Sequence, residues 1–270
     1  EFYRLACTFY VSPGNERTYV VLSGLNENMP AAVQLFEKLL ADAQVNKEAY
    51  TNMTSDILKA RSDAKLNQGQ NFSRLMSFAM YGPKSPATNL LTEAELTNMN
   101  PQELVDRIHN QNSYKHRILY YGPSSSKDLL ATINQYHQVP AALKDIPAGN
   151  EYSYLETPVT KVLVAPYDAK QIYMAQISNL DKKYDPAIEP IRALYDEYFG
   201  GGMNSIVFQE MRETRGLAYS AWASIMPPSY LKYPYVLRTQ IATQNDKMID
   251  AVTTFNDIIN NMPESEAAFK

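Results

Sequence analysis

The chain has 270 residues, of which 45% are hydrophobic, and this is enough for the core of one large domain or two modest ones. A net charge of −4 without any run of Lys and Arg argues against nucleic-acid binding, and no apolar stretch is long enough to span a membrane. Cys7 is the only cysteine, which excludes an internal disulfide and a cysteine-based zinc cluster.

The first part of the chain is predicted to form a hairpin followed by a helix. Strands are expected at residues 3–11 and 18–25, with a turn at residues 12–15 between them. Apolar residues at helical spacing predict a helix at residues 29–40.

The middle of the chain is predicted to be mainly helical. The expected elements are helices within residues 46–80, 95–112 and 127–138 and a strand at residues 116–121. The first helical region should break near Gly69, and Pro101 suits a first helical turn. Residues 139–158 contain three prolines and little periodicity, as is typical of a linker.

The second half is predicted to contain hairpins and further helices. Strands are expected at residues 159–166, 171–180, 217–226 and 235–243, and helices at 190–199 and 248–259. In the helix at 190–199, the residues expected to face inward are Ile191, Leu194, Tyr195 and Tyr198. Strands joined by hairpins favour antiparallel sheets with helices packed on one face, which is an α+β fold.

The order strand, turn, strand, helix occurs twice. The two helices align without a gap at an offset of 219 residues, which extends to Tyr50 and Phe269, and the preceding strands align with Cys7 opposite Tyr219. A repeat of this size is one domain, so we expect two homologous domains, both incomplete. Their predicted bounds are residues 1–145 for the C-terminal part of the first, 146–158 for a linker and 159–270 for the N-terminal part of the second.

The most informative segment is residues 199–219, where a glycine turn leads into a short amphipathic helix. The apolar stripe of this helix is formed by Ile206, Val207 and Met211. Gly216 can end the helix in a left-handed backbone conformation, and a strand follows. Such a reversal can bring Arg212, near the helix end, beside Tyr219 at the start of the strand.

The sequence Met-Arg-Glu-Thr-Arg-Gly-Leu-Ala-Tyr, from Met211 to Tyr219, resembles the second active-site element of pitrilysin/insulinase-type zinc metallopeptidases. The resemblance implies four related α+β domains in two halves, with this chain from the C-terminal, non-zinc half that closes a peptide chamber. It implies that Arg212 and Tyr219 assist catalysis by contacting substrate near the scissile bond. The implied partners are a peptide substrate and the zinc-bearing N-terminal half, in the same chain or in a partner subunit.

The zinc motif of this family, His-x-x-Glu-His, does not occur in the chain. The histidines lack its spacing and are predicted to be surface or strand-end residues: His109, His116 and His137. The resemblance instead places Arg192, Tyr195 and Asp196 at the ligand and base positions. We therefore expect no metal and no cofactor on this chain, with zinc held by the other half of the parent enzyme and the fragment inactive alone.

Interpretations without a catalytic role also remain open. Arg212 can be a solvated helix charge and Tyr219 an ordinary strand aromatic, and Gly200-Gly201-Gly202 can be a helix–helix turn or, less favoured, an anion site. At the level of the protein, the alternative is a non-catalytic peptide-binding or scaffold subunit of the same fold. The chain starts with Glu-Phe-Tyr, so any leader has been removed, and the bacterial periplasm and cytoplasm are both compatible with its soluble composition.

Overall fold

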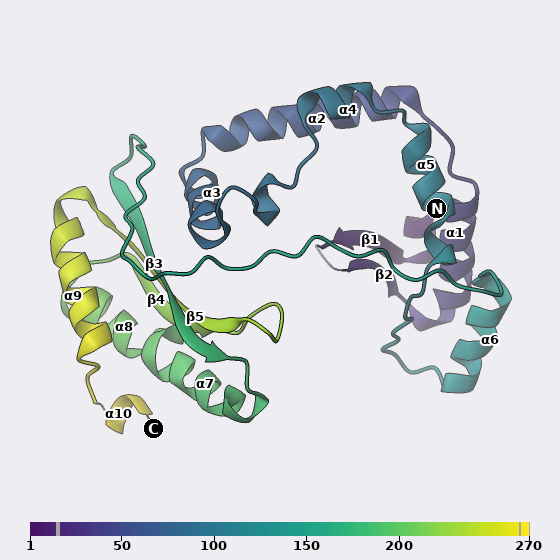
Figure 1. Ribbon diagram of the computed structural model, residues 1–270. Coiled ribbons are helices and arrows are strands. Elements are labelled where there is room, and N and C mark those ends of the chain that lie inside the picture. The colour runs from purple at the N-terminus through teal and green to yellow at the C-terminus, as the bar shows by residue number, and fades with distance from the viewer. Residues whose placement is uncertain (15–16, 265, 270) are drawn as a thin grey trace. The chain divides into compact units, whose positions relative to one another are not determined.

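The computed structural model describes residues 1–14, 17–264 and 266–269. The chain forms two compact units, Glu1–Arg61 with Leu90–Glu151 and Ser62–Asn89 with Tyr152–Lys270 (Figure 1). The predicted domain bounds come from the sequence repeat, whereas these units are defined by contacts in space. The bounds therefore stay a prediction. None of the helices within the described residues has the length and apolar content that a membrane span requires.

The first unit begins with an antiparallel hairpin of β1 (Cys7–Pro13) and β2 (Thr18–Gly24), followed by helix α1 (Met29–Ala41). The side chains of Cys7, Ala32 and Val33 are buried. The strand predicted at residues 18–25 and the helix predicted at residues 29–40 each match the structure to within one residue. Of the predicted turn at residues 12–15, Asn15 lies outside the described residues.

The predicted strand at residues 3–11 begins too early. Phe2–Leu5 form a 3-10 turn, and Ala6 has a left-handed backbone with φ 48° before β1 begins. Cys7 pairs with Gly24, the last residue of β2, so the residues before Cys7 have no strand to pair with. Tyr3 is accordingly exposed.

Further helices follow α1 along the chain. They are α2 (Lys47–Lys65), α3 (Gln68–Tyr81), α4 (Glu93–Asn98), α5 (Gln102–His109) and α6 (Ser126–Tyr136). The break between α2 and α3 precedes Gly69, because the Asn67 side chain accepts a hydrogen bond from the Gln70 backbone and begins α3 there.

The predicted strand at residues 116–121 is wrong. Within the described residues, this part of the chain forms one isolated bridge, between Tyr114 and Lys144, and no ladder continues from it. An alternating pattern makes a strand only where another strand supplies hydrogen-bond partners. Leu119 and Tyr121 are consequently exposed.

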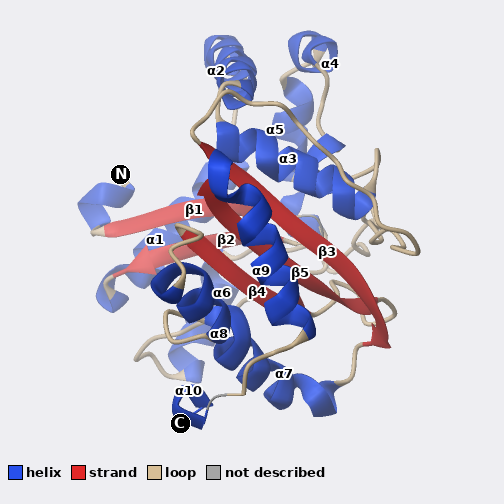
Figure 2. Cartoon of the chain, turned by 90° about the vertical axis from the view of Figure 1, so that its left-hand side faces the viewer, coloured by secondary structure: helices blue, strands red, loops and turns tan. Residues whose placement is uncertain are grey.

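The second unit is built on an antiparallel sheet of β3 (Gln171–Lys183), β5 (Pro234–Gln244) and β4 (Ser220–Met226), in that order. Helix α9 (Met248–Asn260) runs across one face of this sheet (Figure 2). Helix α7 (Glu189–Asp196) and the short α8 (Ile206–Phe208) precede β4, and α10 (Glu266–Phe269) follows α9.

Alternate residues of the strands bury one face of the sheet under helices. Ala221, Ala223 and Ile241 pack in one cluster with residues of α8, the turn that follows it and α9. The helical members of this cluster include Val207, Met211, Ala251, Phe255 and Ile258. The observed architecture confirms the predicted α+β fold with antiparallel sheets and helices on one face.

Two predictions for the second unit are wrong. Residues 159–166 form no strand, because β3 pairs along its length with β5 instead of with the segment before it. On α7, Ile191 and Leu194 are exposed, because Arg192 and Asp196 turn toward β4 and the apolar pair lies on another side of the helix. Tyr195 and Tyr198 do pack against the core, as expected.

The predicted repeat has a counterpart in local structure. Helices α1 and α9 begin and end 219 residues apart, and each follows a hairpin and a 3-10 turn, Asn26–Asn28 or Asn245–Lys247. The common ancestry of the two units stays a prediction, since a strand–turn–strand–helix order is also a frequent local arrangement.

A π-helical turn, Glu197–Gly201, brings the chain close to β4 at one glycine. A Cβ atom at Gly200 would lie 2.3 Å from the Ala223 carbonyl oxygen and 2.5 Å from the Ala223 nitrogen. At Gly202, the nearest atom would be Glu197 Oε2, at 3.9 Å. The close approach of turn and strand thus requires glycine at position 200, whereas position 202 has room for a side chain.

We predict that Gly200→Ala destabilises the chain by about 2 kcal/mol or more, because backbone atoms of a sheet cannot move aside as a flexible side chain can. Urea unfolding followed by circular dichroism measures the change. Gly202→Ala is the matched control and should change the free energy of unfolding by less than about 1 kcal/mol. Equal effects of the two variants would contradict this account of the turn.

Candidate substrate-contact site

The candidate site is built on the reversal between α8 and β4. The Ser205 hydroxyl accepts a hydrogen bond from the Phe208 nitrogen and begins α8, which continues as a π-helical turn, Gln209–Thr214. Ile206, Val207 and Met211 are buried, so the predicted apolar stripe of this helix faces the core. The opposite side of the helix, which includes Arg212, faces solvent.

Gly216 ends the helix with φ +57°, a left-handed conformation that glycine adopts without steric cost. The Met211 carbonyl then accepts hydrogen bonds from the nitrogens of Leu217, at 2.8 Å, and Ala218, at 3.1 Å. Tyr219 joins the sheet through its own nitrogen, which donates to the Ala242 carbonyl on β5 at 2.8 Å. Both ends of the reversal are therefore held by the backbone.

The structure brings the two predicted site residues together at the surface. The Arg212 guanidinium lies over the Tyr219 ring, 5.4 Å from its centroid, and over the Phe208 ring, at 5.0 Å. Tyr219 is 69% exposed, and the Arg212 side chain is 44% exposed. Glu213 approaches the guanidinium at 3.5 Å. The two rings orient a charged group that solvent and ligands can reach.

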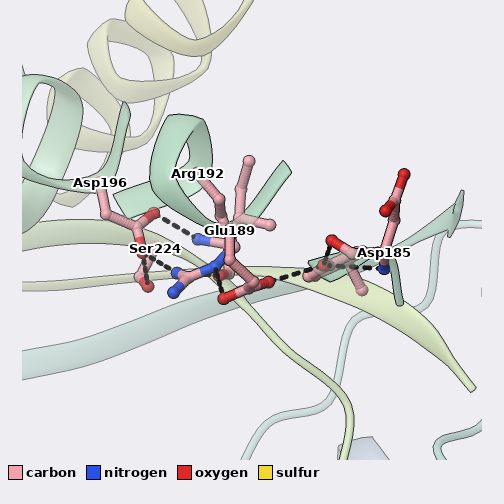
Figure 3. A network of polar contacts seen from close by, with 7 residues as sticks. Asp185, Glu189, Arg192, Asp196 and Ser224 are labelled. Carbon is pink, nitrogen blue, oxygen red and sulfur yellow. Dashed lines mark hydrogen bonds and ion pairs between the residues drawn. The ribbon is translucent and has the colours of Figure 1, made fainter. Parts of the chain in front are cut away.

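Helix α7, which the family resemblance aligns with the zinc helix, has an ion-pair network in place of metal ligands (Figure 3). The Arg192 Nε lies 3.0 Å from Glu189 Oε2, and its Nη1 lies 2.6 Å from Asp196 Oδ2. Tyr235 donates a hydrogen bond to the other Glu189 oxygen at 2.6 Å. The three charges on α7 thus satisfy one another at spacings of three and four residues.

The same network covers the outer edge of β4. The Ile225 nitrogen donates to Asp196 Oδ1 at 2.8 Å, while the Ile225 carbonyl accepts from Arg192 Nη1 at 2.9 Å. The Ser224 hydroxyl donates to Asp196 Oδ2 at 2.9 Å. Both outward backbone groups of Ile225 are therefore occupied, and Gly200 packs against the same strand at Ala223. We call the contacts of Arg192 and Asp196 with Ile225 the edge clamp.

Comparison with known proteins agrees with these features. A family model described as "Peptidase M16 inactive domain" matches residues 118–267. The chain belongs to this family. No curated protein sequence gives a significant match.

Solved structures show the same fold for M16 relatives. The peptidase M16 inactive domain from Pseudomonas fluorescens has a TM-score of 0.67 at 16% identity, over 97% of this chain and 64% of that one. The periplasmic protease PqqL from Escherichia coli has a TM-score of 0.73 at 14% identity, over 98% of this chain and 29% of that one. A chain of Complex III2 from Candida albicans has a TM-score of 0.60 at 12% identity, with coverage of 99% and 67%. The chain thus spans less than two thirds of the two bacterial structures.

The M16 family match confirms the resemblance to the C-terminal half of pitrilysin-type enzymes. Among the described residues, no group of three or more His, Cys, Asp and Glu side chains is arranged to hold a metal ion. His116 and His137 contact each other, Nε2 to Nε2 at 2.8 Å, and His137 Nδ1 lies 2.7 Å from Glu37 Oε1. His109 bonds to the Ala43 carbonyl instead.

Tyr195, which the family resemblance aligns with the general base, does not supply a carboxylate. Burial, and to a smaller extent the charge of Asp196, raises the pKa of its phenol above the ordinary value. Its ring stacks on Phe199 with centroids 5.2 Å apart. Tyr195 is therefore a neutral core residue at physiological pH, and α7 in this M16 domain supports the sheet edge.

Sequence reasoning missed the structural partners of α7. The spacing of Glu189, Arg192 and Asp196 was visible as a charged series on one helix and could have suggested mutual pairing. Tyr235 lies 46 residues from Glu189, and the Ile225 backbone has no signature in sequence. Only the tertiary fold reveals these contacts.

We predict that Asp196→Ala destabilises the chain by about 2 kcal/mol, because it removes one of the two carboxylate partners of Arg192 and leaves the Ile225 nitrogen without its acceptor at a largely buried site. The side chains of the pair are only 18% and 16% exposed. Chemical denaturation measures the loss. Asp56→Ala, at an exposed position of α2, is the control and should change the free energy of unfolding little. If Asp196→Ala also left the free energy of unfolding unchanged, a supporting role for the edge clamp would be ruled out.

We also predict an acid-dependent loss of stability at Glu189. The Tyr235 hydroxyl, and then the Arg192 charge, lower the pKa of Glu189 from its ordinary value of 4.5. Ionised Glu189 therefore stabilises the folded state above that pH, and the contribution disappears as pH falls through the lowered pKa. Tyr235→Phe should flatten the pH dependence of the free energy of unfolding below about pH 4.5, whereas Tyr19→Phe, on exposed β2, should not.

Proposed function

We propose that the chain is the non-zinc C-terminal half of a zinc-dependent endopeptidase, where it closes the peptide chamber and supplies Arg212 and Tyr219 to the substrate. The observation that supports this role best is the juxtaposition of the two side chains, 5.4 Å from guanidinium carbon to ring centroid, on the exposed side of a backbone-fixed reversal. Neither group is sealed inside the core.

The chemistry of the pair suits stabilisation of a scissile carbonyl. A guanidinium stays charged and offers several donors in a fixed plane, and a phenol adds one hydroxyl donor. Phe208 and Tyr219 contact the guanidinium from their ring faces, which limits its freedom before substrate arrives. Donors already aimed at developing negative charge typically contribute about 10²–10³ in rate each.

The zinc in this proposal is held by the N-terminal half, either in the same chain or as a partner subunit. When bound there, zinc supplies an activated water for attack on the peptide carbonyl. Helix α7 does not fit a metal ion, because it presents Arg192 and Asp196 to each other and to Ile225. The role of this half is therefore to bind and orient the peptide and to help exclude bulk water.

A second candidate is a non-catalytic peptide-binding or scaffold subunit. It is favoured by the similarity to a chain of Complex III2, whose name describes an assembly and not a protease. The two candidates differ in the protein that accompanies this chain. A His-x-x-Glu-His half in the same gene or a neighbouring one supports the endopeptidase, and its absence from both supports the scaffold.

We predict that Arg212→Ala and Tyr219→Phe each lower kcat/KM for peptide cleavage by about 10²-fold in the complete protein, with unchanged zinc content, because each removes a donor near the scissile carbonyl. Peptide turnover and metal analysis of the same samples provide the measurement.

Arg215→Ala is the matched control for this experiment. Arg215 lies three residues after Arg212 and its Nε approaches Glu210 Oε2 at 3.3 Å, away from the Tyr219 ring contact. It should leave turnover nearly unchanged. Full activity of both site variants would discard the proposed role, and zinc loss in either would show that the change acts on the metal half.

A further inference from the structure

The face of the β3–β5–β4 sheet opposite the helical core contains a polar and aromatic row. Trp222 on β4 pairs with Gln240 on β5, which pairs with Ala175 on β3. The adjacent row consists of Ser224, Arg238 and Ile177. Alternation along each strand places these side chains away from Ala221, Ala223 and Ile241, which face the core.

Arg238 is an incompletely paired charge on this face. Its guanidinium lies 5.1 Å from the centroid of the Trp222 ring, and its Nη2 reaches Gln240 Oε1 only at 3.4 Å. Within the described residues, Arg238 Nε has no hydrogen-bond partner although that atom is buried. A guanidinium with unsatisfied donors gains from a carboxylate that can accept two hydrogen bonds side by side.

Among the described strand residues that pair in register before the irregularity in β3, none on the face of Arg238 is acidic. Before the register shift in β3, the paired residues that share the face are Gln171, Tyr173, Ala175, Ile177, Asn179, Ser220, Trp222, Ser224, Met226, Val236, Gln240, Ala242 and Gln244, of which Val236 and Ala242 are buried. Asp196, which contacts Ser224 and Ile225 of β4, is already paired with Arg192. These paired residues therefore give the face a positive charge and an aromatic ring but no carboxylate.

This row lies on the strand that begins at the candidate site. Tyr219 and Ser220 both lie opposite Ala242, which is a bulge that interrupts the alternation between them, and Tyr219 precedes Trp222 by three residues. Strands advance about 3.3 Å per residue, which puts Trp222 about 10 Å from Tyr219 along the strand. A peptide extended along β4 would span that distance with about three residues.

We infer that Trp222 and Arg238 form a subsite for an acidic side chain of a bound peptide, about three residues from the bond that Arg212 and Tyr219 contact. The inference rests on the proposed function, because it requires a peptide on this side of the sheet. The carboxylate would accept hydrogen bonds from Arg238, while Trp222 packs against the aliphatic part of the same side chain.

Trp222 provides the measurement, since it is the single tryptophan of the chain. Two short peptides that differ only in a central Glu or Gln are titrated into the protein, and the Trp222 fluorescence is followed. We expect the Glu peptide to bind about tenfold more tightly than the Gln peptide. Raised salt should reduce the difference, because it screens the ion pair.

Arg238→Gln should remove the preference for the Glu peptide without removing binding, and Arg238→Lys should retain part of it because it keeps the charge but loses the planar fork. Arg4→Gln, an exposed position of the other unit, makes the same charge change and should keep the full preference. Circular dichroism confirms that each variant is folded.

The outcomes separate this inference from the proposed function. Binding without a Glu preference, or a preference that survives in Arg238→Gln, overturns the subsite and leaves the roles of Arg212 and Tyr219 intact. Failure of the protein to bind either peptide overturns both the subsite and the peptide-contact function.

Discussion

The Met211 carbonyl accepts two backbone hydrogen bonds from the residues after Gly216, and the candidate site depends on this contact. The Met211 side chain is buried in the core while its carbonyl holds Leu217 and Ala218, so one residue joins the helix, the reversal and the strand. Arg212 follows directly and must point outward. The pair of Arg212 and Tyr219 is thus positioned by backbone geometry and core packing, with the ring contacts refining the guanidinium orientation.

Helix α7 has a structural role in this domain. The positions that the family resemblance aligns with zinc ligands hold Arg192 and Asp196, which occupy the outward hydrogen-bonding groups of Ile225. An open sheet edge can accept another strand, and native proteins commonly cover such edges. The edge clamp therefore closes β4 to strand addition at Ile225 and gives the charged residues of α7 a structural role.

The two faces of the β3–β5–β4 sheet differ for a physical reason. One face is covered by α8 and α9 and contains buried apolar or small residues, with Thr239 and Thr243 as its buried polar members. The other bears Trp222, Gln240 and Arg238 in contact with one another. In the proposed role this face contacts the peptide, while the face covered by helices maintains the fold.

The sequence by itself determined the fold class, most helices and the local form of the reversal, because periodicity, caps and a glycine at position 216 act over a few residues. The short motif from Met211 to Tyr219 also indicated the family. Strands at residues 116–121 and 159–166 were predicted wrongly, since a strand exists only where a distant segment supplies its hydrogen bonds. Only the tertiary structure revealed the clamp on Ile225, the contact of Tyr235 with Glu189 and the unsatisfied Arg238, because each joins residues whose proximity arises from packing and not from spacing along the chain.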